Sequence, residues 1–464
     1  MNQPPPGAAS DLARSRIKDL LGGKQAPSGQ VIVKGWVRTR RDAKGVSFLE
    51  VNDGSSLANL QAVIYESDPA YSIIKELSTG ASVSLTGLLV PSQGQGQKWE
   101  LLVHKIQIVG PSGPDYPLQK KRHSDEYLRE IAHLRPRTNK YGAIMRLRSQ
   151  CAWAIHDFFR AKGFFYVHTP IITGSDAEGA GEMFRVTTLP PGDNKPEEDF
   201  FGKVASLTVS GQLEAELLAM ALDRVYTFGP TFRAENSNTS RHAAEFWMIE
   251  PEAAFFDLND DMDLAESMIK YLVSQALEHS RDDLALFDRF VENGLLDRLE
   301  NLVAAPYVRI SYEDAIEILV KSGADFEFEP FFGADLATSH ERYLCDHFGG
   351  PVIVHDYPSS IKPFYMRLSD DERTVAAMDI LVPKAGELIG GSQREERLDV
   401  LMDRMIKLGM DPKAYQWYLD TRRWGGTPHA GFGLGFERFL MMLTGVTNIR
   451  DVLPFPRTPR NLEF

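Results

Sequence analysis

A polar loop between two predicted strands carries the residues whose types and spacing most suggest chemistry. In segment 228–256, FGPTFRAENSNTSRHAAEFWMIEPEAAFF, the apolar run ends at Phe232, a polar stretch follows, and apolar residues return at Phe246. This pattern predicts a β-hairpin with a long tip, and such a loop is often functional. The tip holds Arg233, Glu235, Arg241 and His242. Arginines match phosphate oxygens and a glutamate can hold an amine or hydroxyl, so the hairpin could grip a nucleotide and a second substrate. The alternative is a solvated tip with surface ion pairs.

A glycine-rich segment near the C-terminus completes a pattern with this hairpin. The stretch 429–445, HAGFGLGFERFLMMLTG, predicts a strand whose backbone a ligand can approach, followed by a helix that carries Arg438. Together, FRAE…TSRH..EF and GFGLGFERFL resemble motifs two and three of class II aminoacyl-tRNA synthetases, in the subgroup with the aspartyl, asparaginyl and lysyl enzymes. The resemblance spans about Val31 to Arg457.

The resemblance implies an α+β fold: an N-terminal five-stranded OB-fold β-barrel joined to a catalytic domain built on a mostly antiparallel sheet flanked by helices. It also implies that ATP activates an amino acid, whose adenylate is then attacked by the 3′-hydroxyl of a tRNA. The first step is in-line attack by an ionised carboxylate on the α-phosphorus, so orientation and charge compensation suffice without a general base.

The same resemblance implies residue roles in binding ATP and Mg²⁺. The expected ATP-binding residues are Arg233 at the α-phosphate, Arg241 and Arg438 at the outer phosphates and adenine face, Phe246 under adenine, His242 near the triphosphate, and Glu387. Arg233, Glu235 and Arg438 are the expected catalytic residues. Asp379 and Glu387 lie on neighbouring predicted strands, where two carboxylates could share Mg²⁺ with ATP phosphates. The alternative for this pair is solvation or ion pairing.

The amino-acid pocket is expected to contain Glu178, Gln212, Glu216 and Arg394. In the aspartyl enzymes a lysine follows the matching glutamine by three positions, whereas here that position is Ala215 and the next is Glu216. A pocket of Arg394 and Glu216 has no net charge, which suits an uncharged carboxamide: Arg394 donates to its oxygen and Glu216 accepts from its NH₂. Aspartate would meet Glu216 with like charge. The alternative is that Glu216 lies on a helix surface.

We therefore expect ligation of L-asparagine to tRNA(Asn). Two alternatives stay open. One is an aspartyl-tRNA synthetase, possibly non-discriminating, and the other is a non-catalytic paralogue that binds tRNA or an amino acid. The four charged residues Arg233, Glu235, Glu387 and Arg438 count against the second alternative, because such paralogues usually lose a charged motif residue.

The chain order predicts four segments: an N-terminal tail with a short helix (1–27), an anticodon-binding OB-fold (28–110), a linker rich in proline and glycine (111–135) and the catalytic domain (136–464). By resemblance, Phe48 stacks on an anticodon base and Gln61 reads the central uridine, with Arg41 beside them. Without the family, Phe48 would be assigned to the barrel core.

A long amphipathic helix over 143–162, followed by the strand-like GFFYVHTPII, resembles motif one, which forms the dimer interface in that family. A homodimer is therefore expected, although an ordinary core helix fits the pattern equally well.

Composition is that of an ordinary globular protein, with 43% apolar and 25% charged residues. No apolar run approaches the roughly 18 residues of a membrane span, and the N-terminus lacks a signal-peptide core, so we expect no membrane partner and a cytoplasmic location. The net charge of −13 argues mildly against nucleic acid, but 34–44 and 120–148 are basic enough to meet a tRNA locally. Four histidines, His340, His347, His355 and His429, show no ligand-like grouping.

Overall fold

The computed structural model describes residues 13–23, 29–94, 96–175, 183–237 and 239–464. The chain divides into two compact units, Met1–Arg146 and Leu147–Phe464, each treated by itself. The division falls within the long helix α3 (Asn139–Ala161). The predicted domain boundaries stay a prediction.

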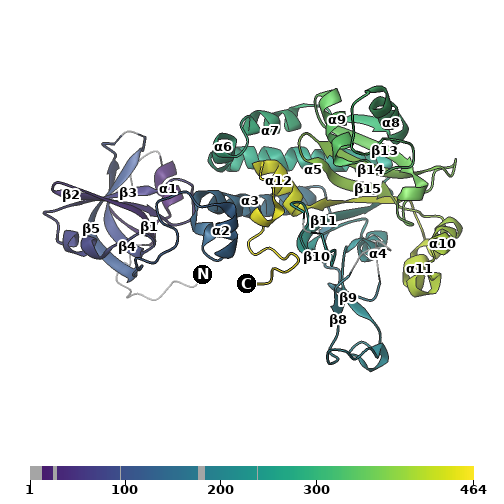
Figure 1. Ribbon diagram of the computed structural model, residues 1–464, viewed down its shortest axis with the longest axis horizontal. Helices are drawn as coiled ribbons and strands as arrows, with labels where there is room; N and C mark the ends of the chain where they lie inside the picture. Colours follow the sequence, from purple (N-terminus) through teal and green to yellow (C-terminus); the bar gives the residue numbers. More distant parts are fainter. Residues whose placement is uncertain (1–12, 24–28, 95, 176–182, 238) are drawn as a thin grey trace, which may run out of the picture. The chain divides into compact units, whose positions relative to one another are not determined.

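The first unit is a closed barrel with strand order β1-β2-β3-β5-β4, which confirms the predicted five-stranded OB-fold (Figure 1). Its strands are β1 (Gln30–Ala43), β2 (Val46–Asn52), β3 (Leu60–Tyr65), β4 (Ser82–Pro91) and β5 (Trp99–Gly110), with α1 (Ile17–Gly22), the 3₁₀ helix η1 (Pro69–Glu76) and α2 (Asp125–Glu130). On β2, burial alternates with period two, so Leu49 and Val51 fill the interior while Phe48 faces outward. Phe48 is therefore not a barrel-core residue.

The second unit is built on an eight-stranded sheet with strand order β12-β13-β14-β15-β16-β11-β10-β6. Among the described strands of this sheet, only the outermost pairs, β12 with β13 and β10 with β6, are parallel, which confirms the mostly antiparallel prediction. The strands are β6 (Phe165–Tyr166), β10 (Arg224–Phe232), β11 (Glu245–Ala254), β12 (Val308–Ser311), β13 (Val352–Pro358), β14 (Thr374–Val382), β15 (Gly386–Gln393) and β16 (His429–Gly435). The segment GFFYVHTPII, predicted as a strand, contains β6 and the first residue of β7 (Ile172–Thr173), and Pro170 between them has no N–H for a sheet hydrogen bond.

Helices cover the sheet. α4 (Gln212–Leu222) packs on β10 and β11, while α5 (Leu258–His279) crosses β14, β15 and β16. The others are α6 (Arg281–Phe290), α7 (Leu295–Ala304), α8 (Tyr312–Lys321), α9 (Thr338–Phe348), α10 (Leu398–Lys407), α11 (Gln416–Arg423) and α12 (Phe436–Thr444), and a small sheet joins β7 (Ile172–Thr173), β9 (Ala205–Leu207) and β8 (Arg185–Val186) (Figure 1). None of the helices in the described ranges is both long and apolar enough to cross a membrane.

The glycines of β16 make room for side chains of the neighbouring strand β11. A Cβ placed on Gly431 would lie 2.5 Å from Glu252 Oε1, and one placed on Gly433 would lie 2.8 Å from Met248 Cε. Any larger residue would displace these side chains. The first two glycines of the GxGxG pattern, Gly431 and Gly433, are therefore explained by the close approach of β11.

A buried carboxyl lies where α5 meets the sheet. Asp261 has no exposed surface, and neither of its oxygens has a hydrogen-bond partner among the described residues. A Cβ on Gly391 of β15 would come within 2.9 Å of Asp261 Oδ2, so the carboxyl packs against bare backbone. Burial raises its pKa well above the usual value, although Arg394 opposes the rise. Asp261 therefore keeps its proton to a higher pH than a free aspartate does, since an unpaired buried charge is costly.

This protonation predicts a pH-dependent stability difference between the wild type and Asp261→Asn. A carboxyl with a raised folded-state pKa stabilises the fold fully below its unfolded pKa of about 3.9, and this contribution is lost as pH rises toward the folded pKa. The asparagine variant has no such titration. The unfolding free energy of the variant minus that of the wild type should therefore grow by up to about 1.4 kcal/mol per pH unit as the pH rises from about 5 toward the folded-state pKa of Asp261. Urea titrations of both proteins at several pH values measure this difference in unfolding free energy. A difference that does not change with pH would contradict a raised pKa of Asp261.

Candidate functional site

Two cavities of the second unit share a wall. The first, of about 220 Å³, is lined chiefly by the polar loop and α12, and the second, of about 420 Å³, lies over β11, β15 and β16. The side chains and backbone common to both belong to Arg233, Glu235, Met248, Glu387 and Gly433. A ligand that fills both cavities would therefore pass Arg233 and Glu235 at the junction.

The first cavity collects all the residues predicted to bind ATP. Its lining includes Arg233, Arg241, His242, Phe246, Glu387 and Arg438. The Arg233 guanidinium lies 5.5 Å from the Phe246 ring centroid, and the Arg233 backbone N–H donates to Ala244 O at 3.0 Å. The hairpin therefore presents one cation against one aromatic face at the entrance to β11.

Two further arginines stand on the far side of this cavity. Arg241 donates through Nη1 to Thr338 Oγ1 at 3.1 Å and through Nη2 to Ala385 O at 2.7 Å, while Arg438 Nη1 lies 3.6 Å from Glu387 Oε2. Burial lowers the pKa of His242, and the neighbouring arginines lower it further. The histidine is therefore neutral at pH 7, and the cavity's positive charge comes from arginines.

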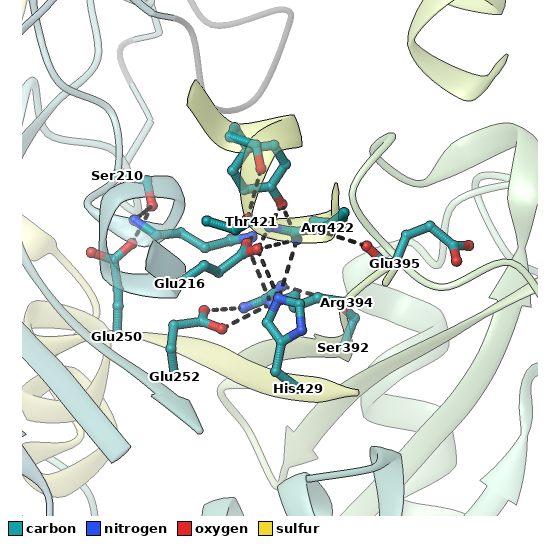
Figure 2. Close-up of polar contacts among 12 residues, drawn as sticks. Ser210, Glu216, Glu250, Glu252, Ser392, Arg394, Glu395, Thr421, Arg422 and His429 are labelled. Atoms are coloured by element: carbon teal, nitrogen blue, oxygen red, sulfur yellow. Dashed lines mark hydrogen bonds and ion pairs between the residues drawn. The ribbon is translucent and has the colours of Figure 1, made fainter. Parts of the chain in front are cut away.

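The second cavity is bordered by a buried network of ionic side chains (Figure 2). Glu216 Oε2 accepts from Tyr418 Oη at 2.6 Å and from Arg422 Nη2 at 2.5 Å, with His429 Nε2 at 3.0 Å, and Oε1 accepts from Gln212 Nε2 at 3.0 Å. Burial alone would raise the pKa of Glu216, but the charge of Arg422 and the hydrogen bond with His429 hold it well below its usual range. Glu216 is therefore ionised.

Arg394 forms the second ion pair of this network. Its Nε and Nη2 donate to Glu252 at 3.1 and 2.5 Å, its Nη1 donates to Ser392 Oγ at 2.9 Å, and Nε lies 3.9 Å from Glu216 Oε1. Burial raises the pKa of Glu252 to about 8, although Arg394 opposes that rise. The Arg394 fork on both Glu252 oxygens is the geometry of an ion pair. These bonds use three of the five N–H donors of Arg394.

The position of Glu216 differs from the prediction. It was expected to face Arg394 across the pocket and to contact the substrate, but it has no exposed surface and lies behind Gln212 and Arg394, outside the described cavity lining. Its helix α4 turns it toward α11, where Tyr418 and Arg422 bind it. The network as a whole still has no net charge, because the carboxylates of Glu216 and Glu252 balance the guanidiniums of Arg422 and Arg394.

Sequence reasoning missed Glu252, Tyr418, Arg422 and His429. The alternation of Phe246, Met248, Glu250 and Glu252 on β11 was visible and places these side chains on one face, since all four line the two cavities. His429 carried no local signal. Its Nδ1 lies 2.9 Å from Thr427 O, and its Nε2 lies 3.1 Å from Arg422 Nη2 and 3.0 Å from Glu216 Oε2.

The carboxylates predicted to hold a metal converge over a bare glycine. A Cβ on Gly390 would lie 3.3 Å from Asp379 Oδ1 and 3.4 Å from Glu387 Oε1. Two carboxylates with open space between them fit Mg²⁺, which usually takes its other ligands from phosphates and water. No three His, Cys, Asp or Glu side chains of the described residues group as metal ligands, so such an ion would depend on a bound polyphosphate.

The predicted anticodon residues lie together on the outer face of the barrel. Arg41 of β1 stands opposite Phe48 of β2, with its guanidinium 4.9 Å from the ring, and Gln61 of β3 donates to Glu100 Oε2 at 3.3 Å. Phe48 is half-buried, and an outward-facing aromatic with an adjacent arginine is a usual platform for an unpaired base. The remaining predicted residue, Glu178, lies outside the described residues.

Comparisons with known proteins agree with this geometry. The family model of tRNA synthetases class II (D, K and N) matches residues 124–459, and that of the OB-fold nucleic acid binding domain matches 31–109. The chain is 63% identical to the asparagine–tRNA ligase of Nitratidesulfovibrio vulgaris (strain DP4) and 62% identical to that of Oleidesulfovibrio alaskensis, covering 98% of this chain and all of each relative.

Among solved structures, the asparaginyl-tRNA synthetase of Pyrococcus horikoshii complexed with asparaginyl-adenylate superposes with a TM-score of 0.86 at 33% identity, covering 97% of this chain and 99% of that one. The aspartyl-tRNA synthetase of Entamoeba histolytica, at 23% identity and a TM-score of 0.80, shares the fold. The chain belongs to the class II tRNA synthetases of the D, K and N group, and it carries their OB-fold nucleic acid binding domain at its N-terminal side.

Proposed function

We propose that this chain ligates L-asparagine to tRNA(Asn) through an asparaginyl-adenylate, with release of pyrophosphate and then AMP. The observation that carries the proposal is the wall shared by the two cavities, because an adenylate has a nucleotide half and an amino-acid half joined at one phosphate. Arg233 stands at that junction. The 63% identical asparagine–tRNA ligase and the solved complex with asparaginyl-adenylate support the same reading.

In the mechanism, the chain's own residues orient the two reactants and compensate charge. The asparagine carboxylate attacks the α-phosphorus of ATP in line, pyrophosphate leaves, and Arg233 stabilises the negative charge on the α-phosphate oxygens. Arg241 and Arg438 hold the outer phosphates while Phe246 supports the adenine. Glu235, at the junction, accepts from amine or hydroxyl groups of the substrates.

Asp379 and Glu387 would hold Mg²⁺, which when bound neutralises phosphate charge. A role in translation supports a cytoplasmic location.

The balanced ion network favours an uncharged side chain. Two of the five Arg394 N–H donors have no acceptor among the described residues and can meet a carboxamide oxygen. Gln212 borders the cavity, and Glu216 behind it fixes the direction of its amide group. A carboxylate in this pocket would add a charge without a counter-ion, which is costly in a buried site. We propose that Glu216 selects asparagine through Gln212 and Arg394.

A homodimer is proposed from the apolar surface around α3. On the second unit, Trp153 of α3 is 68% exposed and Phe165 and Tyr166 of β6 are 56% and 45% exposed. Large aromatic side chains that gather on a surface are typical of interfaces.

Replacing the Glu216 carboxylate should weaken discrimination against aspartate. In amino-acid-dependent ATP–pyrophosphate exchange, the wild type should respond to asparagine and barely to aspartate. Glu216→Gln removes the negative charge and should narrow the ratio of kcat/KM values by at least about tenfold. Glu313→Gln, whose side chain is 73% exposed, is the control and should keep the wild-type ratio. An unchanged ratio in Glu216→Gln would contradict the role of the network.

Removing the Phe48 ring should affect tRNA and leave activation intact. Phe48→Ala should raise the KM for tRNA(Asn) about tenfold or more, because base stacking on an aromatic is worth about 1–3 kcal/mol, while exchange stays at the wild-type rate. Leu88→Ala, at an exposed apolar position of β4, should change neither. A loss of exchange in Phe48→Ala, or an unchanged KM, would count against an anticodon contact.

A charge in the aromatic surface should separate the proposed dimer. Analytical ultracentrifugation should give twice the chain mass for the wild type and the chain mass for Trp153→Asp, since a desolvated charge opposes association. A wild-type monomer at micromolar concentration would remove this part of the proposal.

A further inference from the structure

A buried lysine adjoins the proposed metal site and is not part of the mechanism above. Lys362 follows β13 and its 3₁₀ turn η4 (Ser359–Ile361), lines the amino-acid cavity, and has a side chain only 15% exposed. Its Nζ donates to Asp379 Oδ2 at 3.0 Å and lies 3.9 Å from the Tyr357 ring centroid. Burial would lower the pKa of Lys362, but Asp379 raises it above the usual value. The ammonium is therefore charged and fixed.

The loop that carries Lys362 is itself anchored. Arg404 of α10, which is 8% exposed, donates to the backbone oxygens of Lys362 at 3.3 Å and Ser359 at 3.4 Å, and also to Met366 O. A guanidinium that donates to three carbonyl oxygens of one loop holds the backbone of that loop in one conformation. Lys362 therefore reaches Asp379 from a rigid support and not from a flexible surface segment.

The ammonium binds only one oxygen of Asp379. Oδ2 is taken by Lys362, whereas Oδ1 points toward the space over Gly390 that Glu387 Oε1 also approaches. Groups that hold a metal ligand by its other atom orient it, and their loss usually weakens metal function. The lysine differs from most such groups because it adds a positive charge next to a cation site.

The charges around this space nearly cancel without nucleotide. Asp379 faces Lys362, and Glu387 Oε2 lies 3.6 Å from Arg438 Nη1. A further carboxyl, Glu341, accepts from the Glu387 backbone N–H at 3.1 Å. A divalent cation therefore meets little net negative charge until ATP phosphates arrive.

We propose that Lys362 is a positioning residue with two effects: it directs Asp379 Oδ1 toward the metal site, and its charge keeps divalent cations weakly bound until the nucleotide supplies its phosphates. The identity of the nucleotide in this inference rests on the proposed function. The metal-binding experiment below uses the protein without nucleotide and does not depend on the proposed function.

The experiment titrates Mn²⁺, as a stand-in for Mg²⁺, into the full chain without nucleotide and follows free Mn²⁺ by electron paramagnetic resonance. Lys362→Gln and Lys362→Met, which keeps the packing on Tyr357, should bind Mn²⁺ at least about fivefold more tightly than the wild type, because a nearby like charge is removed. Lys362→Arg should bind as weakly as the wild type. Lys384→Gln, which removes a 63% exposed lysine on the loop between Asp379 and Glu387, should change little.

The same variants separate this role from simple structural damage. Lys362→Gln should lower kcat of asparagine-dependent exchange about tenfold or more, because Asp379 loses its orientation, while its Mn²⁺ affinity in the absence of nucleotide rises. Damage to the fold would instead lower both kcat and the affinity for Mn²⁺. Unchanged or weaker Mn²⁺ binding in both uncharged variants would overturn the proposal, as would tight binding in Lys362→Arg. Absence of exchange in the wild type would instead overturn the proposed function.

Discussion

The site depends on a buried charge balance. Glu216 with Arg422 and Glu252 with Arg394 form two ion pairs that have almost no contact with water, in the border of one cavity. Buried pairs of this kind contribute little net stability, since desolvation offsets most of the attraction, but they penalise any change in the total charge. We propose that this penalty makes the pocket selective for a neutral side chain. Asparagine differs from aspartate in just this property.

The sheet explains how such a network can be assembled from distant parts of the chain. Glu252 comes from β11, Arg394 follows β15, His429 opens β16, and Glu216 and Arg422 come from helices α4 and α11. The glycines at alternate positions of β16 leave space for β11 side chains, so the cavity floor is formed by backbone. In the same way, the missing side chain of Gly390 leaves space in which the carboxylates of Asp379 and Glu387 approach each other. Glycine at these positions is required by packing and not by a turn.

The sequence predicted the architecture and the nucleotide site well. The hairpin, the glycine-rich strand and the barrel each leave a recognisable local pattern in the sequence. The residues assigned to ATP binding all line one cavity. The amino-acid pocket was predicted only in part. Arg394 and Gln212 line it, but Glu216 lies behind them, and Arg422, His429 and Lys362 were not assigned. Ion pairs between residues some 200 positions apart leave no local periodicity, so their partners emerge only from the folded chain.

The central claim, a pocket whose ionic groups cancel, is tested most directly by binding. Isothermal titration calorimetry at pH 7.5 would compare non-hydrolysable analogues of asparaginyl-adenylate and aspartyl-adenylate, which differ only in the side-chain amide. The account predicts that the asparaginyl analogue binds at least about 100-fold more tightly, and that the aspartyl analogue binds only with uptake of a proton, seen as a buffer-dependent enthalpy. Equal affinities, or aspartyl binding without proton uptake, would contradict it.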